Sequence, residues 1–389
     1  MKGQFRGRIA VLGGVIVLVL AAGTWMALSL THASARTTAA NAGGGKGAAA
    51  TKPKIPLRIV AVTPARHARD VNGTAPVRVT FSAALAADSP MPAVRPAVAG
   101  TWQSAGSDAV EFVPARGFRQ YTHVRVHIPG GAAGVRSASG QTLPHAHTVR
   151  FETGGYSASR LTELLAQLGY LPLKWTPTAG QSVPSVGSSK GQLAAAYTPP
   201  SGTFHWRHGY PGTLHTFWDH GSTSGLIMHG AVMTFESDHG LTLDGVAGPL
   251  VWKELLSAAA KDQRNQHGYS YAIASQHVPE TLTVWHDGKV ILHTAANTGI
   301  PAAPTTVGTA PVYLRYTFQI MKGRNPDGTK YADPVRWVSY FRAGEAVHYF
   351  PRASYGFQQS LGCVELPLAQ SKYIWPYMTY GTLVTVTSR

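Results

Sequence analysis

Cys363 is the only cysteine in the 389-residue chain, and His348 precedes it by fifteen positions. A lone thiol cannot form an internal disulfide, which leaves two interpretations, a catalytic nucleophile or a small buried apolar residue. A neighbouring imidazolium can lower a thiol pKa from ~8.5 to ~3.5–7.5, so that a nucleophilic thiolate persists at neutral pH. We therefore predict that Cys363 is the nucleophile and that His348 is its base, which later returns the proton to a leaving amine. A histidine that ends an apolar strand is otherwise an ordinary core residue.

The nucleophile lies in the run Ser360-Leu361-Gly362-Cys363, which has the character of a sharp turn. Gly362 lets the backbone turn tightly and approach another group closely. We predict that the backbone N–H groups of Gly362 and Cys363 bind the oxyanion of an acyl-transfer intermediate. By analogy with other acyl-transfer sites, each such donor lowers the barrier by ~3 kcal/mol.

Four further residues near the nucleophile are predicted to contact substrate: Ser360, Tyr355, Gly356 and Glu365. Ser360 has an alternative role, which is only to cap or brace the turn. Glu365 places a negative charge two residues after the thiol. That charge is expected to raise the thiol pKa and to repel a carboxylate on the substrate.

Strand patterns dominate the chain from residue 269 onward. Asp287-Gly288 separates two apolar runs and predicts a hairpin, and residues 335–350 predict two short strands, the second ending at His348. Residues 382–386 alternate as a closing strand. The polar run 323–333 predicts a long loop, which is either a substrate lid or a plain solvated loop.

The order of the motifs in this segment resembles the catalytic domain of the L,D-transpeptidases, the YkuD family. The chain supplies Thr306-Val307-Gly308, then His348, then Ser360-Leu361-Gly362-Cys363, and the resemblance extends over residues 269–389. It implies a mixed β-sandwich or barrel that acts on peptidoglycan stem peptides, both as donor and as acceptor. In this family the cysteine attacks the carbonyl of the third stem residue and expels D-Ala, and an amine from a neighbouring stem resolves the thioester to a 3→3 cross-link.

Two departures from the family pattern leave alternatives open. Leu361 stands where many members have His, and Glu365 stands where many have Arg. An L,D-carboxypeptidase that passes the same thioester to water is one alternative. A catalytically silent wall-binding protein is the other, although the retained Cys363 and His348 argue against it.

The upstream segments predict a mainly β, multidomain protein. Residues 57–153 alternate with period two between Gly, Pro and Ser turns and weakly resemble a bacterial immunoglobulin-like spacer. Residues 155–262 resemble a small helical peptidoglycan-binding domain with an insertion, on the signature of an apolar helix, Gly240-Leu241, Asp244-Gly245 and a closing helix. Five histidines lie in or next to the insertion, His205, His208, His215, His220 and His229, without carboxylates or cysteines at a recognised ligand spacing. We predict neither a metal site nor a cofactor.

The N-terminus predicts export of the body of the protein. Residues 1–31 comprise a short basic cytoplasmic tip and an uncharged run, 9–30, that is long enough to span a ~30 Å hydrocarbon layer, and residues 32–56 read as a flexible linker. The alternative is a signal peptide that is cleaved after Ala33-Ser34-Ala35. Either way the body lies outside a bacterial membrane, in the cell wall. The net charge of +16 is scattered, which argues against nucleic acid and suits an anionic wall, a membrane surface or simple solubility.

Overall fold

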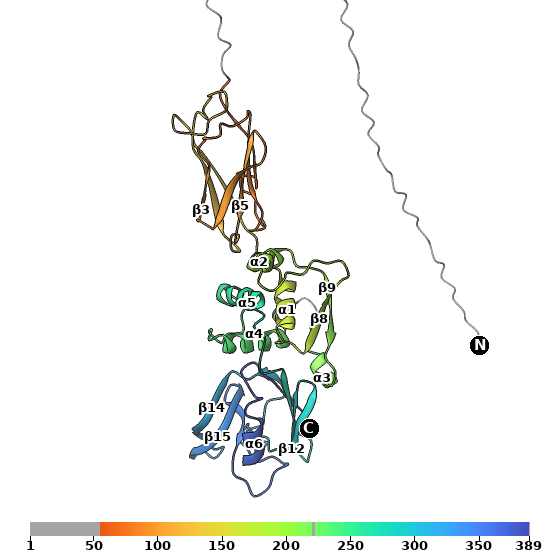
Figure 1. Cartoon of the computed structure of the whole chain (residues 1–389). Coiled ribbons are helices and arrows are strands. Elements are labelled where there is room, and N and C mark those ends of the chain that lie inside the picture. Colours follow the sequence, from red (N-terminus) through yellow and green to blue (C-terminus); the bar gives the residue numbers. More distant parts are fainter. Residues whose placement is uncertain (1–54, 220–221, 389) are drawn as a thin grey trace, which may run out of the picture. The chain divides into compact units, whose positions relative to one another are not determined.

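The structure is a computed structural model that describes residues 55–219 and 222–388. The expected membrane anchor, residues 1–31, and nearly all of the expected linker, residues 32–56, lie outside the described residues. Among the residues that are described, no helix is long and apolar enough to cross a bilayer. Figure 1 shows the order of the elements along residues 55–388.

The first folded segment is a sandwich of two antiparallel sheets. One sheet has the order β1-β2-β5-β4 and the other has the order β3-β6-β7. Alternation explains the packing, since Val124, Val126 and Ile128 of β6 are buried between exposed neighbours. The strands are β1 (Ile59–Thr63), β2 (Val77–Phe81), β3 (Ala93–Arg95), β4 (Gly100–Ser104), β5 (Ala109–Pro114), β6 (His123–Ile128) and β7 (His147–Glu152).

The second segment is mixed rather than purely helical, which corrects the expected small helical domain. The predicted first helix ends where Gly169 adopts a positive φ of 86°. The insertion after it contains a two-stranded sheet and two short helices. In the first strand of this sheet the buried Leu173 and Trp175 alternate with exposed residues. The elements are α1 (Ala158–Gln167), β8 (Leu173–Pro177), α2 (Ser189–Tyr197), β9 (Gly202–Trp206), α3 (Gly212–His215), α4 (Leu226–Asp238) and α5 (Pro249–Lys261).

The C-terminal segment contains two sheets around an apolar core. The five-stranded sheet has the order β12-β11-β10-β18-β13, and the four-stranded sheet has the order β14-β15-β16-β17. The core lies between them and includes Leu282, Val347 and Val384. The strands are β10 (Ser270–Ser275), β11 (Thr281–His286), β12 (Lys289–Ala295), β13 (Gly308–Pro311), β14 (Leu314–Arg324), β15 (Lys330–Arg342), β16 (Glu345–Tyr349), β17 (Val364–Leu366) and β18 (Leu383–Thr387), with helix α6 at Leu368–Ile374.

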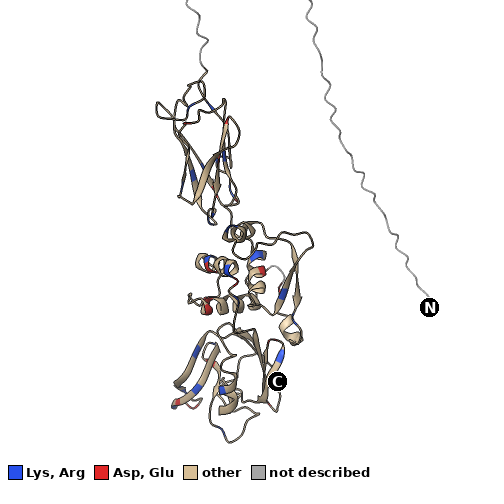
Figure 2. Ribbon diagram, viewed as in Figure 1, with Lys and Arg blue, Asp and Glu red and all other residues tan. Residues whose placement is uncertain are grey.

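The polar run 323–333 is mostly strand, so the predicted long loop was wrong. Strands β14 and β15 pair up to Arg324 and Lys330, and only a tight turn separates them. Asp327 closes that turn by accepting hydrogen bonds from the backbone N–H and the hydroxyl of Thr329. Both faces of the end of this hairpin carry polar residues, so the sequence there lacks the apolar alternation that marks a strand. Figure 2 shows Lys and Arg along these two strands.

Candidate active site

Cys363 lies in a turn directly before β17. Gly362 has a positive φ of 109°, a conformation that residues with a side chain adopt only with strain. The Ser360 hydroxyl donates to the carbonyl oxygen of Cys363 at 2.6 Å and accepts the Gly362 N–H at 3.2 Å. Ser360 is buried beneath the turn and therefore holds it in shape.

His348 reaches the nucleophile through the pairing of β16 with β17. These strands run parallel, with His348 opposite Glu365 and Val347 opposite Val364. Because alternate residues of a strand share a face, His348 and Glu365 lie on the face that Cys363 also occupies. His348 and Cys363, which are fifteen positions apart in sequence, thus become diagonal neighbours on adjacent strands.

The imidazole of His348 is fixed by the backbone. Nδ1 lies 2.9 Å from the carbonyl oxygen of Tyr349, and the ring is only 3% exposed. A carbonyl can only accept, so Nδ1 carries the proton and Nε2 of the neutral ring is left as the basic nitrogen. This orienting group leaves no signal in the sequence, because any residue after His348 supplies the same carbonyl.

His348, Cys363 and Glu365 line one cavity of about 390 Å³. The β14–β15 hairpin, in the same sheet, provides much of the remaining lining, through residues that include Gln319, Lys322, Tyr331, Asp333 and Tyr340. Three predicted substrate contacts, Ser360, Tyr355 and Gly356, are not among the lining residues.

Tyr355 and Gly356 instead shape the loop between base and nucleophile. The Tyr355 hydroxyl donates to the Phe350 carbonyl oxygen at 2.6 Å. The Gly356 N–H donates to Asn297 Oδ1 at 3.0 Å, and Asn297 in turn pairs through its backbone with Glu365. Both residues therefore connect to the site through its supporting loops.

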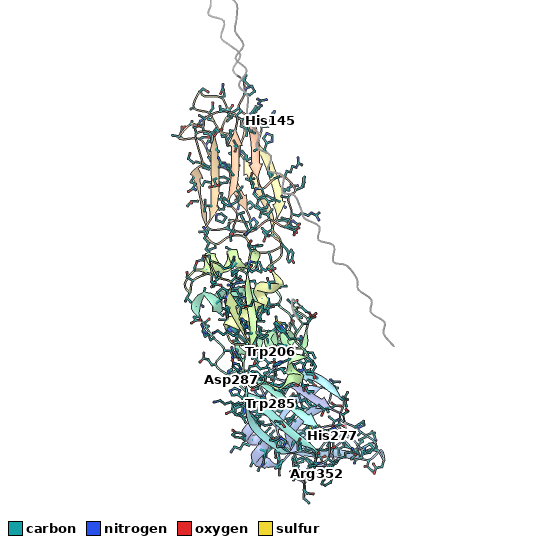
Figure 3. All side chains as sticks on the ribbon, turned by 90° about the vertical axis from the view of Figure 1, so that its right-hand side faces the viewer. His145, Trp206, His277, Trp285, Asp287 and Arg352 are labelled. Atoms are coloured by element: carbon teal, nitrogen blue, oxygen red, sulfur yellow. The ribbon has the colours of Figure 1, made fainter. Side chains whose placement is uncertain are left out.

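Glu365 does not stand as an isolated negative charge. Arg352, labelled in Figure 3, forms two hydrogen bonds with it, Nε to Oε2 at 2.8 Å and Nη2 to Oε1 at 2.8 Å. Arg352 also donates to the Gln359 carbonyl oxygen at 2.9 Å and packs over the ring of Phe350. We expected the charge of Glu365 to repel substrate carboxylates. The structure corrects this expectation, because the bidentate contact with Arg352 offsets the negative charge. Sequence spacing does not identify Arg352 as the partner of Glu365.

Glu345, at the start of β16, is a second residue that the sequence reasoning missed. Its Oε1 accepts hydrogen bonds from the backbone N–H of Thr306 at 3.0 Å and from the Thr306 hydroxyl at 2.6 Å. The neighbouring Thr305 hydroxyl accepts the Gly299 N–H at 2.8 Å, and Gly299 bridges to Ser360. The loop that precedes β13 is thereby tied to the nucleophile turn.

Burial disfavours the charged forms of both Cys363 and His348. Burial raises the pKa of the Cys363 thiol to about 12, and the charges of Glu365 and Glu345 add to the rise, while the Ala346 N–H opposes it. The residue keeps some exposed surface, but the atoms packed around the sulfur desolvate it. Burial also lowers the pKa of His348. The sequence predicted a standing thiolate; burial acts against that charged form, so the resting thiolate stays a prediction.

Within residues 55–219 and 222–388, no cluster of His, Cys, Asp and Glu side chains has the arrangement of a metal site. The chemistry that this geometry supports is acyl transfer, with the thiol as nucleophile and Nε2 of His348 as proton acceptor.

Comparison with known families supports this chemistry. Residues 271–386 match the L,D-transpeptidase catalytic domain (YkuD), and residues 53–153 match a bacterial Ig-like domain (Big_5). The chain thus carries a YkuD-type catalytic domain and an Ig-like domain, and the family points to a peptidoglycan-modifying enzyme. The matched ranges leave residues 154–270 between them, so the peptidoglycan-binding character of that segment stays a prediction.

Several solved structures are similar to parts of this chain. An L,D-transpeptidase from Mycobacterium smegmatis is 14% identical, covers 86% of this chain and 100% of its own, and has a TM-score of 0.29. L,D-transpeptidase 3 from Mycobacterium tuberculosis is 16% identical, with 85% and 98% coverage and a TM-score of 0.28. The catalytic domain of the E. faecium L,D-transpeptidase is 28% identical over 30% of this chain and 95% of its own, with a TM-score of 0.28. No curated protein sequence matches the chain.

Proposed function

We propose that this chain is a peptidoglycan L,D-transpeptidase that forms 3→3 cross-links through a thioester on Cys363. The observation that supports the proposal is the geometry of one cavity, in which the thiol and His348 share a strand face and Nδ1 of His348 is committed to a carbonyl. The proposed cellular location is extracytoplasmic, in the bacterial cell wall, with residues 9–30 as the membrane anchor.

The first half-reaction begins with a neutral thiol. As Sγ attacks the carbonyl carbon of the third stem residue, the thiol proton passes to Nε2 of His348. The tetrahedral intermediate then collapses, the bond to the terminal D-Ala breaks, and His348 returns the proton to the leaving amine. A thioester and free D-Ala result.

The second half-reaction regenerates the thiol. The amine of a neighbouring stem attacks the thioester carbonyl and gives its proton to His348, which passes it to the departing sulfur. Attack of water on the thioester gives a trimmed stem instead. Transfer to an amine therefore requires an acceptor that fills the cavity and excludes water. Asp333, on the hairpin, is a suitable hydrogen-bond acceptor for an N–H of the incoming amine.

The oxyanion is expected to bind the backbone N–H of Cys363. The Gly362 N–H, the other expected donor, already contacts the Ser360 hydroxyl at 3.2 Å, a long hydrogen bond that it can share or exchange. In this mechanism Ser360, Tyr355 and Gly356 position the turn, while Glu365 positions Arg352 at the cavity wall.

Digestion of enzyme-treated peptidoglycan, with the fragments separated and weighed, tests the proposal. Wild-type protein is expected to produce 3→3 dimers, and Cys363→Ala is expected to produce none. Trimmed tripeptide monomers without dimers would favour the L,D-carboxypeptidase. No change in the wall, together with retained binding to it, would favour the catalytically silent protein.

A further inference from the structure

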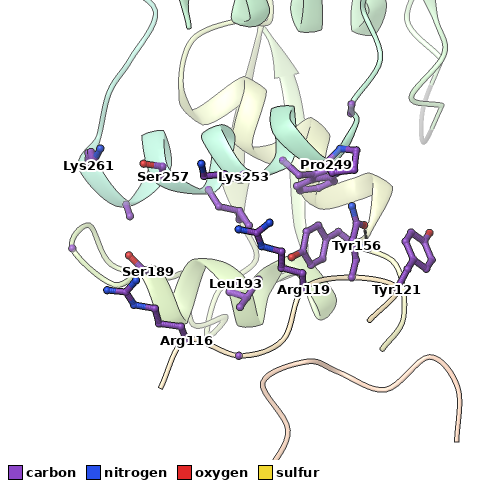
Figure 4. Close-up of a pocket in the computed structure, with 17 residues that line it drawn as sticks. Arg116, Arg119, Tyr121, Tyr156, Ser189, Leu193, Pro249, Lys253, Ser257 and Lys261 are labelled. Carbon is purple, nitrogen blue, oxygen red and sulfur yellow. Dashed lines mark hydrogen bonds between the residues drawn. The ribbon is translucent and has the colours of Figure 1, made fainter. Parts of the chain in front are cut away.

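A large cavity lies away from the catalytic site. It has a volume of about 900 Å³, and none of its lining residues lines the catalytic cavity. Figure 4 shows α5 along one side of this cavity and the segment that carries Arg116 and Arg119 along the other. We call it the basic groove, defined by Arg116, Arg119, Lys253 and Lys261 with Tyr121, Tyr156 and Trp252.

Helix α5 supplies one continuous wall of the basic groove. Pro249, Trp252, Lys253, Ser257 and Lys261 all line it. Residues three and four positions apart lie on the same face of a helix, so these side chains form a row about three turns long. A row of this length suits an extended ligand better than a compact one.

Hydrogen bonds hold the opposite wall in place. The Tyr156 N–H donates to Gln120 Oε1 at 3.0 Å, and the Tyr197 hydroxyl donates to the Phe118 carbonyl oxygen at 3.1 Å. The Thr153 hydroxyl donates to the Arg119 carbonyl oxygen at 2.5 Å. The loop that carries both arginines is therefore anchored through its backbone and through Gln120, which leaves the arginine side chains available.

The groove carries charge of one sign only. Its four charged lining residues are all cations, and no carboxylate lines it. None of the four forms an ion pair with any residue of the described parts of the chain, and all four are exposed. A concave surface lined by one sign of charge concentrates ligands of the opposite sign.

Aromatic rings accompany the cations. Tyr156 packs edge-on against Trp252 with the ring centroids 5.0 Å apart, and Tyr121 is 67% exposed beside the groove. Such rings offer an apolar face together with a polar edge, which suits the faces and hydroxyls of sugar rings. Cations and rings together match a glycan that carries carboxylates.

We propose that the basic groove is a second, non-catalytic binding site for a peptidoglycan strand. The four cations pair with carboxylates of the peptide stems, and the tyrosines contact the sugars. The choice of peptidoglycan among anionic polymers rests on the proposed function. Binding here raises the effective concentration of stems at the catalytic cavity of the same molecule without taking part in the reaction.

Sedimentation of the full chain with purified peptidoglycan sacculi tests the groove, in a Cys363→Ala background that prevents turnover. Arg119→Glu/Lys253→Glu is expected to weaken binding by at least about tenfold, since both cations become repulsive. The milder Arg116→Gln/Lys261→Gln is expected to weaken it by about threefold. The matched control is Arg125→Glu/Lys174→Glu, which makes the same change in net charge at two exposed residues outside the groove.

Several outcomes would overturn the proposal. If both groove variants bound sacculi as tightly as the wild type, the groove would not be a binding site. An equal loss of binding in the control variant would show that scattered positive charge alone binds the wall. Loss of binding after phosphate-containing polymers are stripped from the sacculi would contradict the choice of peptidoglycan.

Acylation by a carbapenem, measured in chains that retain Cys363, separates this proposal from the proposed function. The groove variants are expected to react at the wild-type rate. A wild-type chain that does not react would refute the catalytic proposal and leave the binding result standing.

Discussion

Replacing Arg352 with Gln is expected to destabilise the catalytic domain and to shift the pH dependence of acylation. The substitution leaves Glu365, whose side chain is 5% exposed, without its bidentate partner. Removing one member of a buried ion pair costs about 3–5 kcal/mol, because the other charge stays buried. Arg352 is 28% exposed, so water reaches its place and the lower end, about 3 kcal/mol, applies.

The matched variants separate pairing from simple loss of contacts. Glu365→Gln leaves a guanidinium that water partly solvates, so its expected cost is smaller, about 1.5 kcal/mol. Arg352→Gln/Glu365→Gln removes both charges and is expected to cost less than the two single changes together. The expected coupling between the residues is about 2 kcal/mol.

A short pulse of carbapenem after incubation in urea measures stability in this domain alone, because only folded catalytic domain is acylated at Cys363. Intact mass gives the fraction acylated at each urea concentration. If the two single effects add without coupling, the ion pair does not hold the site together and the reasoning is wrong.

The pH dependence supplies a second measurement that a purely structural role would leave unchanged. The positive charge of Arg352 lowers the pKa of His348, and the negative charge of Glu365 raises it. Arg352→Gln removes the lowering influence, so more of His348 is protonated in mildly acidic solution and less of it acts as a base. The acid limb of the acylation rate is expected to move to higher pH. An unshifted acid limb would contradict the electrostatic influence of Arg352 on the base.

Three further predictions follow from the same site. Alkylation of Cys363 by iodoacetamide is expected to rise about tenfold per pH unit from pH 7 to 10, since only the thiolate reacts and burial raises the thiol pKa to about 12; a plateau below pH 9 would indicate a standing thiolate. Gly362→Ala is expected to cost about 1–3 kcal/mol and to slow acylation, because φ is 109° there, whereas Gly212→Ala, where a new Cβ meets open space away from the catalytic cavity, is the control and is expected to change little. Burial lowers the pKa of His348 below its value in the unfolded chain. The contribution of His348 to stability is therefore present above the unfolded pKa and is lost as the pH falls below it. His348→Gln is expected to flatten the decline in unfolding free energy from pH 7 to 5, and parallel stability curves for variant and wild type would contradict this.

The candidate nucleophile and base could be proposed from the sequence because their signals are local. A lone cysteine after Gly362, with His348 at the end of an apolar strand, carries its chemistry in residue type and spacing. The alternation of residues such as Val124 and Val126 likewise predicted strands, because one face of each sheet is buried and the other meets water.

The supporting contacts were not predictable because they arise from strand register. Arg352 meets Glu365, and Glu345 meets Thr306, only once β16 has paired with β17 and the loops have closed. The thiol pKa has the same origin, since the burial that raises it depends on the packed fold.

The most direct test of the central claim is the mass of the enzyme after reaction with a disaccharide-tetrapeptide donor and no acceptor. The mechanism predicts an adduct equal to the donor minus its terminal D-Ala, joined as a thioester to Cys363 and absent from Cys363→Ala. An adduct on another residue, or one that persists in Cys363→Ala, would contradict the assignment of Cys363 as the nucleophile.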